Sequence, residues 1–197
     1  MIDAWQGGRS EKPPPRSPFC IPAIDAKLEQ DAFSILSADL VRINHACSML
    51  ALLPDAAEDG RDDICRALIA FFRRDWRLHQ DDVVSHLGSR LRAKLLVGDR
   101  TDEVLDELAR QHLDDRIRFA LISASLHALL DGQPIDLERF AAERDWFIEA
   151  QRRQSALKRV LVLAVARERL TPEDAVAVHR DMMSARKNPA PNHTGVV

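Results

Sequence analysis

The sequence predicts an all-α protein, an up-down-up-down four-helix bundle with a short fifth helix at its C-terminal end. Leu, Ala and Arg dominate the 197 residues, whereas glycine occurs only 7 times and tyrosine is absent. This composition favours helix over strand. Proline, which disrupts a helix interior, occurs only where helices are expected to begin or end and in the two terminal segments. No segment alternates polar and apolar residues for long enough to predict a sheet.

Four long helices and one short one account for the hydrophobic pattern. The first is expected over residues 24–53, and the second over 61–96 with fraying or a break at Gly88. Loops of about 4–10 residues between long amphipathic helices predict antiparallel neighbours.

Capping signals mark the starts of the remaining helices, which are expected over residues 101–130, 136–170 and 171–186. Thr101 is the expected N-cap of the first of these, and Asp136 could cap the second. The run from Thr171 to Asp174 reads TPED, which is a capping box with proline at the first helical position.

The bundle itself is predicted to cover residues 23–187, between a Pro/Gly-rich disordered arm over 1–22 and a flexible tail over 188–197.

A net charge of −3 gives no reason to expect nucleic acid or a membrane surface as a partner. No uninterrupted apolar run approaches the roughly 20 residues that span a bilayer.

The cysteines predict a reducing compartment. Cys20, Cys47 and Cys65 are odd in number and lack CxxC spacing, so a disulfide framework is not expected and a cytoplasmic location is. The sequence also lacks a Gly-rich phosphate loop, a nucleophile elbow and an HExxH motif. An enzyme is therefore not the expected class.

Three of the predicted helices each carry one histidine within an apolar stripe. Residues spaced by three, four or seven positions share one face of a helix, so these histidines are predicted to point toward the bundle axis. Metal sites in bundles are built from side chains on facing helices, although a hydrogen-bonded core histidine is the common alternative. The stripes are Val41, His45, Met49 and Leu52; Leu68, Phe72, His79 and Val83; and Leu105, Leu108, His112, Phe119 and Leu126.

The segments around these histidines resemble hemerythrin-like (HHE cation-binding) domains. The resemblance is carried by LVRINH ending at His45, FFRRDWRLH ending at His79, LDELARQH ending at His112, and the closing stretch from LAVARERLTPED to MMSARK. It covers residues 30–187 and implies a four-helix bundle around a non-haem di-iron centre, with histidines from all four helices and two bridging carboxylates. It also implies oxygen binding, oxygen or redox sensing, or iron handling. By position, the three histidines match those of the family's first three helices.

The sequence departs from the family at the remaining ligand positions. The family's second helix usually reads His-x-x-x-Glu, but position 83 is valine, and its fourth-helix histidine and acid are matched by Gln154 and Lys158. Arg116 stands one turn after the third histidine. Two iron ions in a low-dielectric interior need anionic bridges, so an intact di-iron site is not expected.

Two aspartates lie near the lost carboxylate positions. Asp82 and Asp115 are each about 60° from the histidine stripe of their helix, so each would reach the site only through a local rotation of the helix. His86 follows one further turn along the second helix, near the face of His79.

These residues leave two classes of function. We favour a metal-free bundle that acts as a non-catalytic regulatory, interaction or sensory protein through a protein partner. Its interior would be an anion-favouring cavity lined by Arg116 and Lys158, or a packed core with Lys158 reaching the surface. The alternative is a metal-binding protein in oxygen or redox sensing or iron handling. There, His45, His79 and His112, with His86 or Asp82, would hold one Fe or Zn ion.

Overall fold

The computed structural model describes residues 20–53 and 58–187, and the helices in these ranges are joined without any strand. The all-α prediction is confirmed. Most of the predicted arm and the whole predicted tail lie outside the described residues. The elements are η1 (Leu28–Gln30), α1 (Ala32–Leu52), α2 (Glu58–Arg73), α3 (Asp75–Asp81), η3 (Asp82–Leu87), α4 (Gly88–Arg92), α5 (Thr101–Leu130), α6 (Leu137–Leu157), η4 (Lys158–Val162), α7 (Leu163–Arg169) and α8 (Pro172–Lys187).

Several of these elements follow one another directly and form long helical runs, one from α2 to α4 and one from α6 to α7. The break predicted at Gly88 is wrong, because this residue is helical with φ −60° and ψ −42°. Glycine suits the position since a Cβ there would lie 3.1 Å from the carbonyl oxygen of Val83. The interruption instead falls at Arg74, whose φ of −120° and ψ of −72° separate α2 from α3.

The helix starts follow the capping signals with two exceptions. Asp136 accepts a hydrogen bond from the Arg139 amide at 3.0 Å. In the predicted capping box, the Thr171 hydroxyl accepts from the Asp174 amide, and the Asp174 carboxylate accepts from the Thr171 amide, both at 3.2 Å. The N-cap predicted at Thr101 is wrong by one position, because Arg100 precedes the first helical residue.

The first long helix also begins later than predicted. Asp31 caps α1 by accepting from the Ser34 amide at 2.9 Å, so the helix begins at Ala32, and only the short 3₁₀ turn η1 forms before it. Asp31 has an extended backbone, which is the usual conformation of an N-cap residue.

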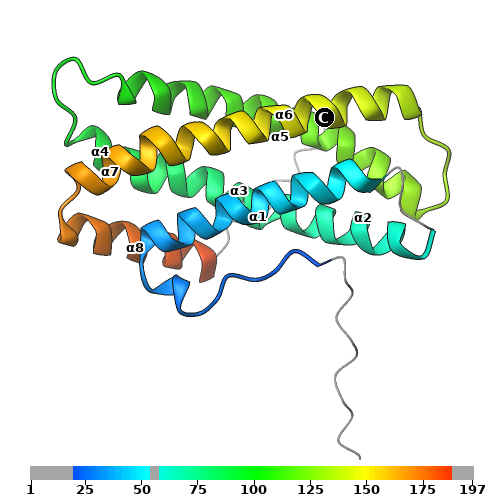
Figure 1. The fold of residues 1–197 in the computed structure, drawn as a ribbon, viewed down its shortest axis with the longest axis horizontal. Coiled ribbons are helices and arrows are strands. Elements are labelled where there is room, and N and C mark those ends of the chain that lie inside the picture. Colours follow the sequence, from blue (N-terminus) through cyan, green and yellow to red (C-terminus); the bar gives the residue numbers. More distant parts are fainter. Residues whose placement is uncertain (1–19, 54–57, 188–197) are drawn as a thin grey trace, which may run out of the picture.

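The long helices lie side by side along the longest dimension of the molecule (Figure 1). α1 packs against α6 and α2, and α5 also packs against α6 and α2. α8 packs across α1 and η3 near one end of the molecule (Figure 1). This arrangement leaves one interior, enclosed by α1, the α2–α4 run, α5 and the α6–α7 run.

Aromatic side chains form one part of that interior. The rings of Phe72, Trp76, Phe119 and Phe147 are all buried, and their centroids lie 4.8–5.9 Å apart. These rings come from α2, α3, α5 and α6, so the cluster ties those helices together.

α1 is long and apolar enough to cross a membrane when judged by length and composition alone, although Asp39 and Arg42 lie within it. Half of its most apolar window is buried inside the structure. A helix that packs one face into a protein core passes the same test, so this is weak evidence for a membrane segment.

Replacing Phe72 with alanine tests the aromatic cluster. The change removes a fully buried ring that packs against four other aromatic rings, so we expect the free energy of unfolding to fall by about 3–5 kcal/mol. Urea denaturation followed by circular dichroism measures this value. Val160→Ala, on an exposed side chain, should change it by less than about 0.5 kcal/mol, and equal losses in the two variants would contradict the assignment of this core.

Candidate functional site

Polar and charged side chains form another part of the interior. We refer to Asp39, His79, Asp82, His112, Asp115, Gln151, Gln154 and Lys158 as the buried polar cluster, and each of them is buried. They come from α1, α3, η3, α5, α6 and η4, so the cluster joins all the long helical runs. Buried polar groups are stable only when they are hydrogen-bonded or paired with opposite charge.

Two of the three predicted metal-ligating histidines face the interior. His79 and His112 are buried, as their positions in the apolar stripes predicted. The inward orientation predicted for His45 is wrong, because that side chain is exposed, as are Val41 and Leu52 of the same predicted stripe.

The apolar pattern of α1 explains the error at His45. Buried residues recur at spacings of four and three, which is the seven-residue repeat of a helix that packs along one face. On a helix of 3.6 residues per turn, position 45 lies on the opposite side from this face. The repeat consists of Leu36, Leu40, Ile43, Cys47 and Leu50.

The three histidines therefore do not share one centre in this structure. Within residues 20–53 and 58–187, no group of three or more His, Cys, Asp or Glu side chains is placed to hold a metal ion. His86, the additional predicted ligand, is half-buried, and its Nε2 lies 3.9 Å from Asp82 Oδ1.

Lys158 lies inside the bundle with 2% of its surface exposed, which decides against the alternative in which it reaches the surface. Its ammonium forms no ion pair with any carboxylate in the described part of the chain. Burial lowers the pKa of Lys158 to about 8, and the nearby Asp115 charge partly opposes this change. The positively charged form is thus disfavoured by its surroundings but still predominates at neutral pH.

Arg116 does not line an internal cavity with Lys158, as one of the predicted interiors required. Its side chain is partly exposed and donates to Gln80 Oε1 at 2.9 Å and to Asp81 Oδ1 at 2.7 Å. These bonds join α5 to α3 at the edge of the bundle. Among the residues that the structure describes, Lys158 and Arg116 therefore do not form a joint cationic cavity that would favour an anion.

Amide side chains surround Asp115. Its Oδ2 accepts hydrogen bonds from Gln151 and Gln154, both at 2.8 Å. Gln151 in turn accepts from the Trp76 indole at 2.8 Å, so the network continues into the aromatic cluster. Burial raises the pKa of Asp115, and the bonds from the two glutamines and the charge of Lys158 act against this rise. A groove of about 350 Å³ between α5 and α6 approaches this carboxylate.

Arg186 holds the other two buried carboxylates. Its guanidinium donates to Asp39 Oδ2 at 2.9 Å and also to Asp82 Oδ2, so α8 is bonded to both α1 and η3. Arg42 donates to the second oxygen of Asp39 at 3.0 Å. Burial raises the pKa of Asp82 to about 6 despite the charge of Arg186. For Asp39, burial acts in the same direction, but His79 and the two arginines outweigh it and lower the pKa.

The two inward histidines are neutral at physiological pH. Burial lowers the pKa of His79 to about 4 and lowers that of His112 further, and the charge of Lys158 adds to both effects. His79 Nδ1 lies 3.8 Å from Asp39 Oδ2, too far for a hydrogen bond. Neither ring nitrogen of His79, nor His112 Nε2, has a hydrogen-bond partner among the described residues. Because the unfolded chain binds protons more readily, these histidines destabilise the fold as pH falls from about 6.5 toward 4.

The residues present do not fit a di-iron centre. Val83 is buried at the position where the resemblance implies a bridging carboxylate, and Lys158 is buried where it implies the fourth-helix acid. The carboxylates of Asp39 and Asp82 are engaged by Arg186. A site for two divalent cations needs free carboxylates, whereas here two of the buried carboxylates are bonded to Arg186 and a buried lysine adds positive charge.

Asp82 and Asp115 are fully buried, although both were expected to lie off the histidine stripe. Each lies three residues after a buried histidine, and residues at that spacing share one face of a helix. η3 and η4 are π-helical, with the Gly88 amide bonded to the Val83 carbonyl and the Leu163 amide bonded to the Lys158 carbonyl. Asp82 begins η3 and Lys158 begins η4, so each π-helical segment starts at a buried charged residue.

Sequence reasoning missed Asp39 and Arg186 as members of the site. The buried repeat of α1 places Asp39 one turn after Ile35, on the inner side of the helix, and this signal could have found it. Arg186 gave no comparable signal, because nothing local in α8 indicates that a residue near its C-terminal end reaches two carboxylates on other helices.

No protein-family model matches the chain, and no curated protein and no solved structure is significantly similar to it.

Replacing Arg186 with methionine tests the carboxylate pair. Asp82 would lose the arginine that is bonded to it, and Asp39 would lose one of its two arginines, so we expect the free energy of unfolding at pH 7 to fall by about 3–5 kcal/mol. Arg180→Met, on an exposed side chain of the same helix, should change it by less than about 0.5 kcal/mol. Adding Asp39→Asn and Asp82→Asn to Arg186→Met should recover part of the lost free energy of unfolding, because the unpaired charges are then removed. A decrease of less than about 1 kcal/mol in Arg186→Met alone would contradict the role given to Arg186.

Replacing Lys158 with methionine tests the buried ammonium. The difference between a pKa of about 8 and the ordinary value of 10.5 corresponds to roughly 3 kcal/mol against folding at pH 7. We expect Lys158→Met to raise the free energy of unfolding by about 1–3 kcal/mol at pH 7, whereas Arg159→Met leaves it nearly unchanged.

The pH dependence of this gain follows from linkage. Between pH 8 and 10.5 the unfolded chain binds more protons at Lys158 than the folded protein does, so wild-type stability rises with pH in this window. The advantage of Lys158→Met should therefore shrink from pH 8 upward and vanish by about pH 10.5. Chemical denaturation at several pH values measures this, and an advantage independent of pH would contradict a charged buried lysine.

Proposed function

We propose that this protein is a hemerythrin-like bundle that has lost its di-iron site and acts as a non-catalytic regulatory, interaction or sensory protein. The observation that carries the proposal is the burial of Lys158 at a position where the resemblance implies a metal-binding acid. With Arg186 on the two nearby carboxylates, the interior obtains its positive charge from the chain itself. A bundle whose interior positive charge comes from its own side chains does not need a metal ion to neutralise its buried carboxylates.

The packing of the helices supports the finer architecture within this proposal, an up-down-up-down four-helix bundle with α8 as the short fifth helix. Each long helical run has two neighbours among the others, and consecutive runs are joined by short connections. Short connections favour antiparallel neighbours. The inward positions of His79 and His112 are consistent with descent from a bundle that once used them as ligands.

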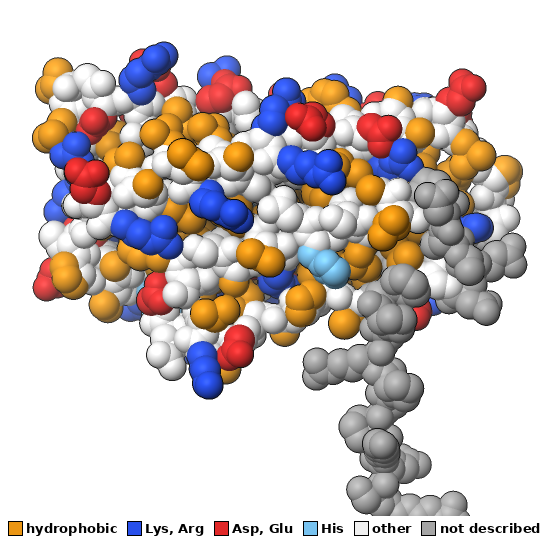
Figure 2. Space-filling model, viewed as in Figure 1, with side chains coloured by type: hydrophobic (Ala, Val, Ile, Leu, Met, Phe, Trp, Pro, Cys, Tyr) orange, Lys and Arg blue, Asp and Glu red, His pale blue; other side chains and the backbone are white. Residues whose placement is uncertain are grey.

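The chemistry of the surface and of the thiols supports a protein partner in a reducing cytoplasm. Acidic and basic side chains are interspersed on the face in Figure 2, without a broad basic area of the kind that nucleic acid or an anionic membrane attracts. Cys20, Cys47 and Cys65 are all free thiols, and burial raises the pKa of Cys47 to about 12, which keeps that thiol unreactive.

The second candidate is a metal-binding protein in redox sensing or iron handling. The unpartnered ring nitrogens of His79 and His112 favour it, because a buried imidazole without a hydrogen bond is available to a metal. Lys158 opposes it, since an ammonium beside the two rings repels a cation. A mononuclear site would also need a ligand in place of His45.

Metal content decides between the two candidates. We expect purified protein that is loaded anaerobically with Fe²⁺ or Zn²⁺ and then desalted to retain well under one metal ion per chain by mass spectrometry. About two irons per chain, with visible absorption bands after exposure to air, would overturn the proposal. About one ion per chain that is lost in both His79→Ala and His112→Ala, but not in His45→Ala, would establish the second candidate.

A further inference from the structure

The outward face of α5 is apolar over about 22 Å, the length of a helix from residue 113 to residue 128. Leu113, Ile117 and Leu121 are 62%, 59% and 40% exposed. Ala120 and Ala124 are exposed on the same face, and Ala128 ends it. These residues recur every three or four positions, opposite the buried side of the helix. A helix face that only meets water normally carries charged residues, so this surface, which we call the α5 stripe, is unpartnered.

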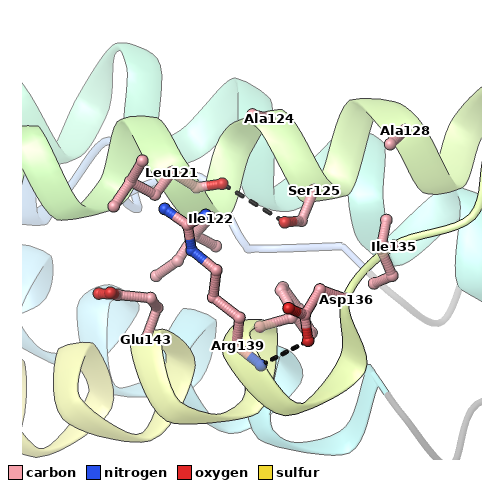
Figure 3. Close-up of a pocket in the computed structure, with 10 residues that line it drawn as sticks. Leu121, Ile122, Ala124, Ser125, Ala128, Ile135, Asp136, Arg139 and Glu143 are labelled. Atoms are coloured by element: carbon pink, nitrogen blue, oxygen red, sulfur yellow. Dashed lines mark hydrogen bonds between the residues drawn. The ribbon is translucent and has the colours of Figure 1, made fainter.

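Large and small side chains are unevenly distributed along the α5 stripe. The branched residues Leu113 and Ile117 lie toward its N-terminal end, and Ala124 and Ala128 lie toward its C-terminal end. Beside the alanine half is a groove of about 320 Å³ that is lined mainly by apolar side chains of α5 and α6. Figure 3 shows Arg139 extending from α6 across this groove toward Leu121.

We propose that a second copy of this chain covers the α5 stripe, with the two α5 helices antiparallel and related by a two-fold axis near Ala120 and Leu121. In this register, Leu113 and Ile117 of one copy lie at the same heights along the helix axis as Ala128 and Ala124 of the other copy. We call this height the level of a residue. Each branched side chain then meets a small one, which lets the helices approach closely and interdigitate. A self-complementary surface of this kind is what a two-fold interface requires.

Charges near the stripe favour the same orientation. Asp114 and Arg139 each form no ion pair within the described residues. Antiparallel pairing places Asp114 of one copy at the level of the second copy's His127, next to Ala128, which lines the groove that contains Arg139. Arg110 and Asp131, at the two ends of the stripe, are likewise brought to the same level. Parallel pairing would instead place Asp114 next to Asp114 and branched side chains against each other, which is unfavourable for both charge and packing.

The size of the stripe sets the expected affinity. One helix face from each copy makes an interface at the small end of specific interfaces, below about 1,200 Å² in total. We therefore expect a reversible dimer with a dissociation constant of about 1–100 μM. The dimer is independent of the proposed function, because metal content and self-association are measured separately.

Sedimentation equilibrium of the full chain from about 1 to 300 μM tests the proposal, a range chosen to bracket the affinity expected for a small interface. The wild type should shift from monomer to dimer, and Ile117→Glu should raise the dissociation constant at least tenfold. Val41→Glu is the matched control, because Val41 is as exposed as Leu113 but lies on α1. A wild type that stays monomeric throughout, or equal weakening by both variants, would overturn the proposal.

Disulfide cross-linking tests the orientation. In a chain carrying Cys20→Ser to remove the exposed thiol, Ala120→Cys places two thiols beside the two-fold axis, so mild oxidation should yield a cross-linked dimer. Ala128→Cys places them roughly 20 Å apart in the antiparallel pair, so it should not cross-link. Cross-linking of both variants would indicate a parallel pair, and cross-linking of neither would exclude this interface; either result overturns the proposal.

Discussion

One end of this bundle depends on Arg186, whose guanidinium bridges the carboxylates of Asp39 and Asp82. Each carboxylate is almost wholly removed from water, and neither could remain ionised there without a counter-charge. Because the arginine belongs to α8 and the carboxylates to α1 and η3, one side chain sets the position of three elements. Val178 and Met182, the buried side chains of α8, then pack at a defined position. The ion pairs of Arg186 fix the position of α8 relative to α1 and η3, and the burial of apolar side chains provides most of the stability of this end of the bundle.

The interior has two regions of different chemistry. Around Phe72 and its aromatic neighbours, packing is apolar and every contact is favourable. Around Lys158, the chain keeps an ammonium and neutral imidazoles out of water, with Asp115 as the nearest group of opposite charge. The aromatic region offsets the unfavourable charge burial, and Gln151 connects the two regions through its bonds to Trp76 and Asp115. The buried polar groups therefore lower the stability of this part of the molecule, and the apolar packing around them makes their burial possible.

The sequence predicted the helical class, the capping box at Thr171 and the inward positions of His79 and His112, since each rests on local spacing. It failed at His45 because the apolar stripe of Val41, His45, Met49 and Leu52 was interpreted as the buried face, whereas the seven-residue repeat of α1 lies on the other side of the helix. It left the direction of Lys158 open, as a long side chain can reach either water or the core from one helical position. The role of Arg186 depends on contacts 104 and 147 residues away along the chain, which no local pattern contains.

The two π-helical segments have a consequence for comparing this chain with any other. Each holds one residue more than the same stretch of α-helix would, so each is equivalent to a single-residue insertion that turns the following helix by about 100°. An ungapped alignment through residues 82–87 or 158–162 would therefore pair inward positions of one protein with outward positions of the other. Relatives that lack these insertions will match this chain in register only when a one-residue gap is allowed in each segment.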